Sequence, residues 1–316
     1  MWPGVFFGRL LLANGPRHRG FFCACCAWLG AGPHVCGPAS GRCYNGLAMI
    51  SQPDPSSRGA FETDGFYITD GPILPAAVVQ AAVEGIEQIR AGRYDRGRPP
   101  VGSAWNPGDD PGKFCKIEQP QFADQAIYDL VSHSVLGAWA AQLTGATMIQ
   151  AWWVQLLCKP PASPSRPGDT KVGWHQDRSY WTCWTADSTL LTAWVALSDV
   201  GPDCGPMKFL RGSHRWGFKE GLSDFFGQDL DQQRQRIAAF GAAWDEVDVL
   251  LPAGGVSFHD RLTFHASHVN TSPHPRCSLA IHLRSERCWP EPKLPSSMLR
   301  SFTDQPDLCP VLVGSL

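Results

Sequence analysis

The segment "GWHQDRSYW", from Gly173 to Trp181, places two good metal ligands, His175 and Asp177, two positions apart. In an extended strand, successive side chains alternate between the two faces, so His175 and Asp177 point the same way and Gln176 points the opposite way. An imidazole and a carboxylate on one face suit non-haem iron. A His-x-Asp pair also arises by chance in a chain with ten histidines, so a metal site needs a further ligand.

A third ligand has to come from a distant strand. The segment "FHDRLTFHASHVNTSPHPR" offers four histidines: His259, His265, His268 and His274. His265 is favoured because Ser267 follows on the same face and Arg276 follows eleven positions on. A hairpin would place Arg276 beside His265 on the next strand, where the planar guanidinium binds a carboxylate through two parallel hydrogen bonds. His259 is the main rival as third ligand.

Two neutral imidazoles and one carboxylate leave half of an octahedral coordination sphere open. The open positions could accept reactants, and the protein would then have to position them and exclude water. The tryptophans that could wall such a dry pocket are Trp152, Trp153, Trp174, Trp181, Trp184 and Trp194. For Trp152, Trp153 and Trp184, ordinary core packing is the favoured interpretation.

Four segments, in this order along the chain, resemble the phytanoyl-CoA dioxygenase branch of the iron(II)- and 2-oxoglutarate-dependent oxygenases. They are "AFETDGFYIT", "WHQDRSYW", "LTAWVALSDVGPDCGPMKFLRGSHRWG" and "GGVSFHDRLTFHASHVNTSPHPRCSLAIHL". The resemblance runs from about Phe61 to about Arg284. It implies that His175, Asp177 and His265 hold Fe(II), with 2-oxoglutarate and O2 as co-substrates.

The resemblance also implies which residues contact 2-oxoglutarate. Arg276 would bind its distal carboxylate with Ser267 beside it, and Trp194 would line the co-substrate pocket. Lys116, in "FCKIEQP", matches a lysine near the co-substrate less firmly, because loop regions align poorly. Gln155 is a candidate pocket residue by its position on a strand only.

The order of the predicted elements indicates the fold, because helices come first and short strands follow. The expected helices lie within 60–71, where a turn and a strand follow, and within 74–92 and 123–145, the last range holding two. The expected strands lie within 148–161, 189–200, 202–214 and 276–286, with a pair formed by "WDEVDVLLPAGGVSFHD" and "LTFHASHV". We therefore predict an α+β fold: a double-stranded β-helix (jelly-roll, cupin-like) core with N-terminal helices packed on one sheet.

Composition limits the partners that we expect. The net charge is −2 and the pI is about 6.5, which argues against nucleic acid, and we found no apolar run of about twenty residues that would span a membrane. The arginines at positions 93, 96 and 98 are interpreted as a solvated loop. We expect a small-molecule substrate, reduced scattered cysteines and a cytoplasmic location. The oligomeric state stays open.

Residues 1–48 differ from the rest of the chain because they lack a hydrophobic period and carry five of the twelve cysteines. Met49 looks like an ordinary start. We predict a disordered extension or an upstream start for 1–48, with a targeting segment as the alternative. Residues 49–316 are predicted to form a single Fe(II)/2-oxoglutarate dioxygenase domain.

The function predicted from this pattern is hydroxylation of a C–H bond in a small organic molecule, with decarboxylation of 2-oxoglutarate to succinate and CO2. One alternative is a cupin-like metal-dependent isomerase or hydrolase, which has no need of Arg276 as a carboxylate clamp. Another is a non-catalytic jelly-roll binding module, which gains nothing from an intact set of His175, Asp177 and His265.

Overall fold

The computed structural model describes residues 53–163, 170–240, 243–293 and 302–316, so the prediction for residues 1–48 lies outside the described part. The α-helices are α1 (Ser57–Asp64), α2 (Ala76–Arg90), α3 (Gln125–Val131), α4 (Ser134–Thr144) and α5 (Leu230–Ala238). The 3-10 helices are η1 (Pro120–Phe122), η2 (Asp177–Ser179) and η3 (Ser213–Trp216). Helices dominate the first half and strands the second, as the sequence predicts.

The strands form two antiparallel sheets. The strands before the metal-ligand segment are β1 (Phe66–Ile68), β2 (Gly102–Ser103), β3 (Cys115–Glu118) and β4 (Ile149–Lys159). The later ones are β5 (Val172–His175), β6 (Leu190–Ala196), β7 (Met207–Leu210), β8 (Glu246–Asp248), β9 (Val256–Asp260), β10 (His265–Ser267), β11 (Arg276–Ser285) and β12 (Val311–Val313). The large sheet has the order β1-β9-β6-β11-β4-β3-β2, with β12 also paired to β4, and the small sheet has the order β5-β10-β7-β8.

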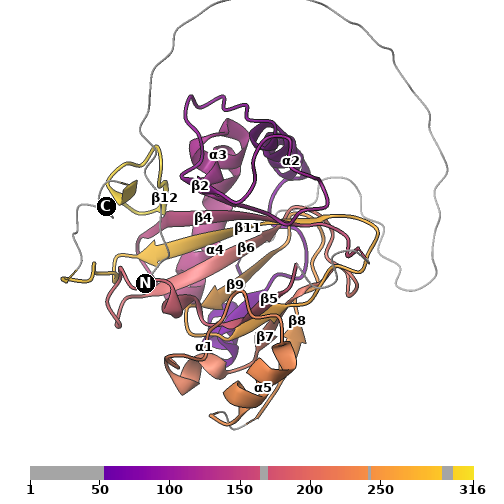
Figure 1. The fold of residues 1–316 in the computed structure, drawn as a ribbon. Coiled ribbons are helices and arrows are strands. Elements are labelled where there is room, and N and C mark those ends of the chain that lie inside the picture. The colour runs from indigo at the N-terminus through magenta and orange to yellow at the C-terminus, as the bar shows by residue number, and fades with distance from the viewer. Residues whose placement is uncertain (1–52, 164–169, 241–242, 294–301) are drawn as a thin grey trace, which may run out of the picture. The chain divides into compact units, whose positions relative to one another are not determined.

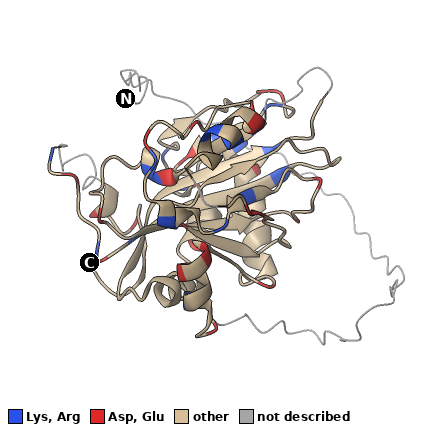
Figure 2. Cartoon of the chain, turned by 90° about the horizontal axis from the view of Figure 1, so that it is seen from below, with Lys and Arg blue, Asp and Glu red and all other residues tan. Residues whose placement is uncertain are grey.

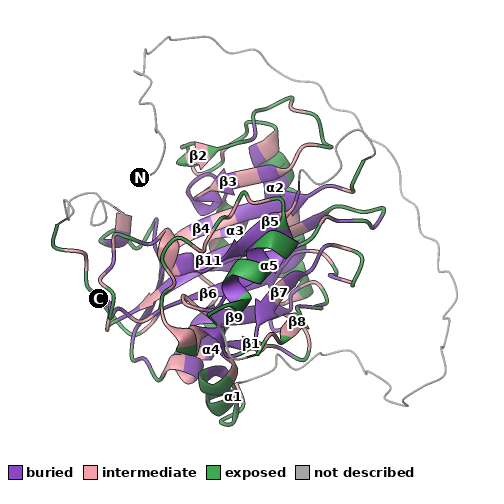
Figure 3. Ribbon diagram, turned by 60° about the horizontal axis from the view of Figure 1, so that its bottom comes forward, coloured by how far each residue is buried: buried purple, intermediate pink, exposed green. Residues whose placement is uncertain are grey.

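Helices cover the outer face of the large sheet. Figure 1 shows α2 and α3 above this sheet and the small sheet with α5 below it. The main hydrophobic cluster joins α2, α3 and α4 to outward side chains of β4, β6, β9 and β11. The strands between these layers are buried, whereas α1 and α5 show exposed faces (Figure 3). The predicted fold, a double-stranded β-helix with helices on one sheet, is confirmed.

Local signals explain the helix boundaries near the N-terminus. Helix α1 ends at Gly65, whose φ of 83° is left-handed, and β1 follows at once. Helix α2 begins after Pro75, whose backbone is pre-set for a helix start, and Gly92 follows its end with a φ of 73°. A side chain at Gly65 would also meet the ring of His214, so both the backbone conformation and the limited space at this turn require glycine.

Two expectations about strand pairing are wrong. The segments that become β9 and β10 do not pair with each other, because β9 joins the large sheet and β10 the small one. Arg276 is likewise not on a hairpin partner of His265, since β11 lies in the large sheet between β4 and β6. The chain crosses between the sheets at each of these connections, as a jelly roll requires.

The interpretation of all scattered cysteines as reduced thiols is also wrong. Cys158 on β4 and Cys277 on β11 form a disulfide, and their Cα atoms lie 4.1 Å apart as direct cross-strand partners. They are 119 positions apart in the sequence, so no local spacing reveals the pair. The other cysteines in the described ranges are free.

Charged residues of both signs are interspersed along the described chain, as Figure 2 shows. Among the helices that the structure describes, none has the length and apolar character needed to cross a membrane.

Candidate metal and co-substrate site

Three side chains that could hold a metal ion converge where the two sheets face each other. His175 ends β5, Asp177 begins η2 and His265 begins β10, with His175 and His265 as cross-strand partners. Their potential ligand atoms all lie within 4.8 Å of one another, and all three residues are buried. Of the predicted site residues, these three are therefore brought together as expected.

The local backbone differs from the prediction in one respect. Strand β5 ends at His175, and Asp177 already belongs to η2. Gln176 between them is still extended, so its neighbours point to the same side. The Gln176 amide points the other way and donates to the carbonyl oxygens of Gly217 and Leu262, which fixes this turn.

Hydrogen bonds set which ring nitrogen of each histidine faces the centre. Nδ1 of His175 lies 2.8 Å from the carbonyl oxygen of Gly173, and Nδ1 of His265 lies 3.0 Å from that of Thr263. A carbonyl only accepts, so Nδ1 carries the hydrogen and Nε2 keeps its lone pair. The two Nε2 atoms lie 3.8 and 3.7 Å from Oδ1 of Asp177. This donor set fits a non-haem iron ion.

The second carboxylate oxygen of Asp177 is held by the large sheet. Oδ2 accepts a 2.7 Å hydrogen bond from Oγ1 of Thr192 and lies 3.2 Å from Nε2 of His259. Thr192 Oγ1 also lies 2.9 Å from Nδ1 of His282. His259 uses its Nε2 on the carboxylate, so the geometry favours His265 over His259 as the third ligand.

The electrostatics of the three residues suit metal binding. Burial lowers the pKa of the His175 imidazole, and burial with His175 nearby lowers that of His265 well below its usual range. Burial alone would raise the pKa of Asp177, but His265 and the hydrogen bond from His259 hold it well below its usual range. The site thus presents two neutral imidazoles and one carboxylate, the protonation states that bind a metal.

A second cluster carries positive charge. Arg276 on β11 is 3% exposed, and its guanidinium carbon lies 5.2 Å from the ring centroid of Trp194. Within the described ranges its side chain makes no hydrogen bond or ion pair that would compensate its charge, and its buried Nε has no partner. Burial lowers the pKa of Arg276 to about 10. A buried unpaired cation is costly, so this position favours an anionic ligand.

Lys159 lies beside Arg276 and was not identified from the sequence. The two residues are direct cross-strand partners on β4 and β11, so their side chains share a face. Lys159 is fully buried, and its Nζ donates to Oγ of Ser267 over 2.7 Å and to the carbonyl oxygen of His268 over 2.5 Å. Its position four residues after Gln155, at the end of an apolar strand, was the available signal.

Lys116 and Gln155 do not join Arg276. Both contact Glu118 on β3: the Lys116 ammonium lies 2.9 Å from Oε1, and the Gln155 amide donates to the same oxygen over 3.2 Å. The indole of Trp153 donates to Oε2 of Glu118 over 2.7 Å. Gln155 and Lys159 are four residues apart on β4, which is about 13 Å along the strand. Lys116 lies opposite Leu157, two residues from Lys159.

Aromatic side chains cover the metal-ligand end. The rings of Phe225 and Tyr180 lie 5.2 and 5.8 Å from that of His175, centroid to centroid. Lys116 Nζ lies 4.8 Å from the centre of the Phe225 ring. The loop that carries Phe225 runs so close to β5 that a side chain at Gly173 would meet the carbonyl of Asp224. This cover excludes water from the three ligands.

The tryptophans divide between packing and lining. Trp152, Trp181 and Trp184 form one buried cluster, as the core interpretation predicts for Trp152 and Trp184. Trp181 lies 4.7 Å from the ring of His282, which faces the site from β11. Trp153 is partly buried and packs against this cluster, while its indole donates to Glu118.

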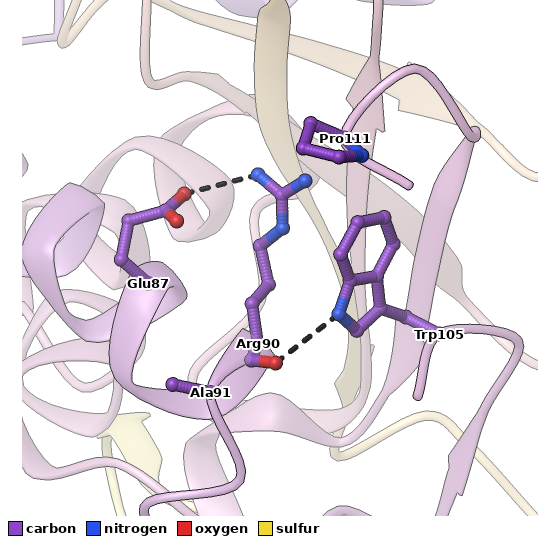
Figure 4. Close-up of a pocket in the computed structure, with 5 residues that line it drawn as sticks. All are labelled: Glu87, Arg90, Ala91, Trp105 and Pro111. Atoms are coloured by element: carbon purple, nitrogen blue, oxygen red, sulfur yellow. Dashed lines mark hydrogen bonds and ion pairs between the residues drawn. The ribbon is translucent and has the colours of Figure 1, made fainter. Parts of the chain in front are cut away.

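A surface depression of about 230 Å³ lies elsewhere, between α2 and the loop after it. It is lined by Glu87, Arg90, Ala91, Trp105 and Pro111 and shares no residue with either cluster (Figure 4). The Arg90 guanidinium stacks 4.1 Å over the Trp105 ring, and the Trp105 indole donates to the Arg90 carbonyl. These contacts attach the loop to the helix end, which is a structural role.

Comparison with solved structures shows the same fold. SnoK, a non-heme alpha ketoglutarate dependent carbocyclase from nogalamycin biosynthesis, is 21% identical, with a TM-score of 0.61 over 84% of this chain and 99% of that chain. ThoJ, described as a non-heme monooxygenase, is 27% identical in its apo form, with a TM-score of 0.54 over 75% and 79%. EctD from S. alaskensis is 21% identical, with a TM-score of 0.54 over 72% and 75%.

No curated protein matches the chain. A family model does match: that of phytanoyl-CoA dioxygenase (PhyH), over residues 61–278. Together with the His–Asp–His cluster, this match confirms the predicted class, an iron- and 2-oxoglutarate-dependent enzyme. The chain belongs to the phytanoyl-CoA dioxygenase family.

Proposed function

We propose that the protein is a dioxygenase that hydroxylates a C–H bond of a small organic molecule and converts 2-oxoglutarate to succinate and CO2. One observation carries the proposal. The ligand atoms of two histidines and one aspartate lie within 4.8 Å of one another, in the same interior as a buried arginine that has no partner among the described residues. The three ligand residues can bind a metal cation, and the arginine can bind a carboxylate. Both face one interior, so together they could bind a metal ion and a dicarboxylic keto acid. Iron(II), when bound, would supply the centre at which dioxygen is activated, and the decarboxylation of 2-oxoglutarate would drive that activation.

The residues of this chain position the reactants. His175, Asp177 and His265 would hold the iron, with Thr192 and His259 fixing the carboxylate of Asp177. Because Oδ2 is held by these bonds, Oδ1 is directed at the two imidazoles. Such outer contacts orient a ligand before the metal arrives.

Arg276 would bind the distal carboxylate of 2-oxoglutarate, with Ser267 and the Trp194 ring beside it. This arrangement directs the keto acid along the inner face of the large sheet toward the metal. Lys116 and Gln155 would line the pocket at the metal end, near Phe225, rather than at the Arg276 end.

The decisive experiment measures succinate formation. The purified protein, supplied with iron(II), 2-oxoglutarate and dioxygen, should release succinate even without substrate through slow uncoupled turnover. His175→Ala should abolish it, and His274→Ala, which alters an exposed histidine, should leave it unchanged. Absence of succinate from the unaltered protein, or equal yields from His175→Ala, would remove the proposal.

The type of product needs a second measurement. Hydroxylation places one oxygen atom from dioxygen in the product, so labelled dioxygen should transfer label to it. Resemblance to ThoJ, described as a monooxygenase, favours this outcome. An unlabelled product with a new ring or an inverted centre would favour chemistry of the kind named for SnoK and for the epimerase SnoN.

A further inference from the structure

The end of the site that contains Arg276 holds two buried basic side chains rather than one. Lys159 is fully buried and Arg276 is 3% exposed, and they are direct partners across β4 and β11. Placing two like charges side by side out of water costs free energy unless an anion joins them. In the described part of the chain neither makes an ion pair with a carboxylate. Burial, together with the neighbouring Arg276, holds the pKa of Lys159 well below its usual range, so an anionic ligand at this point would stabilise the charged form of both groups.

The hydrogen bonds of Lys159 show how it acts. Its Nζ donates to Oγ of Ser267, so the hydroxyl hydrogen of Ser267 points away from Lys159. Among the described residues no acceptor for that hydrogen is present. Ser267 is thereby turned into a donor, which is what a carboxylate beside Arg276 requires.

Lys159 also ties the two sheets together at this point. It lies at the end of β4 in the large sheet, and its two acceptors, Ser267 and His268, lie at the end of β10 in the small sheet. Asn270 donates to the backbone carbonyl of Lys159, so the contact is fixed from both sides. Hydrogen bonds to both its side chain and its backbone therefore fix Lys159 in place between Arg276 and Ser267.

We propose that Lys159 is a positioning residue that makes the site selective for dicarboxylic over monocarboxylic 2-oxo acids, by orienting Ser267 and placing a second buried basic group beside Arg276. The inference rests on the proposed function, because it takes the ligand of Arg276 to be the distal carboxylate of 2-oxoglutarate. A monocarboxylic analogue such as 2-oxopentanoate has the same keto acid end and lacks the group that Lys159 would serve.

Lys159→Met tests this, since it keeps the length of the side chain and removes the charge and the donors. The unaltered protein and the variant are titrated with 2-oxoglutarate and with 2-oxopentanoate in the presence of manganese(II), with tryptophan fluorescence as the signal. We expect the variant to lose about 10- to 100-fold in affinity for 2-oxoglutarate. Its affinity for 2-oxopentanoate should stay within about twofold, whereas a merely structural role would weaken both acids alike.

Lys159→Gln, which retains donors without charge, replaces the Met variant if that variant does not fold. We expect a loss that is again selective for 2-oxoglutarate but smaller, because an amide can still donate to Ser267. Equal affinities of variant and unaltered protein for 2-oxoglutarate, or a parallel loss for both acids, would overturn the role of Lys159. If instead the unaltered protein neither binds 2-oxoglutarate nor forms succinate, the proposed function itself fails.

Discussion

The two faces of the large sheet contrast sharply although the same strands build both. The outward face of β11 carries Leu279, Ile281 and Leu283, which pack under the N-terminal helices. The inward face of the same strand carries Arg276 and His282, which face the metal and co-substrate site. Both faces are buried, so burial alone does not separate structure from function here.

The difference between the faces lies in how polar atoms are satisfied. The outward side chains are apolar and need no hydrogen-bond partners. They stabilise the fold because packing under the helices removes their apolar surface from water. The inward face carries an apolar cluster that includes Leu157, Trp194 and Ala280, and beside it a polar network. This network ends at Asp177 and, among the described residues, leaves Arg276 without a partner. Arg276 is the charged inward group that has no protein partner among the described residues, so we expect a ligand to bind on this face.

Among the substitutions that test this difference between the two faces, replacing Arg276 should have the largest effect on activity. Arg276→Leu removes the charge that the distal carboxylate needs, so we expect the KM for 2-oxoglutarate to rise by about 30- to 1000-fold. Steady-state succinate assays measure it. Arg276→Lys should recover only part of the affinity, because an ammonium lacks the planar fork. A normal KM in Arg276→Leu would contradict the assignment of this face to ligand binding.

Removing a polar contact behind the metal ligands should have a smaller effect. Thr192→Val deletes the hydroxyl that donates to Asp177 while keeping the shape of the side chain. We expect iron affinity to fall by about 10- to 100-fold, as for other outer contacts of metal ligands. Iron titration of the purified variant measures it, and Thr192→Ser, which keeps the hydroxyl, is the control that should stay close to normal.

An outward substitution should leave the chemistry intact. Ile281→Ala leaves a cavity under the helices, and we expect the free energy of unfolding to fall by about 2–5 kcal/mol. Urea denaturation measures this loss, while succinate formation per folded molecule at low temperature should not change. A variant that kept its stability but lost activity would show that the two faces are not separate in function.

Much of the fold could be predicted because its signals are local. Helix α2 shows its apolar period, its leading Pro75 and its following Gly92, all within one segment of sequence. The metal site was also readable, since His175 and Asp177 are close in sequence and His265 is followed at a fixed spacing by Arg276. The order of four such segments along the chain then carried the family resemblance.

The hydrogen-bond partners of these residues could not be predicted from the sequence, because they depend on the register between strands that are distant in the sequence. Thr192 bonds Asp177 across the gap between the sheets, and Lys159 meets Ser267 although 108 positions separate them. The prediction of a hairpin between His265 and Arg276 was wrong for the same reason. Spacing in sequence gives the face on which a residue lies, but not the sheet to which its strand belongs.

By itself, the sequence determined which residues can do chemistry, because ligand type, charge and alternation along a strand are properties of short segments. Only the tertiary structure decided which of them meet and what each then contacts. It paired Lys159 with Arg276, placed His259 behind Asp177 and joined Cys158 to Cys277. The physical reason is that buried polar groups must be satisfied wherever the packed sheets bring them, and packing is set by the whole chain.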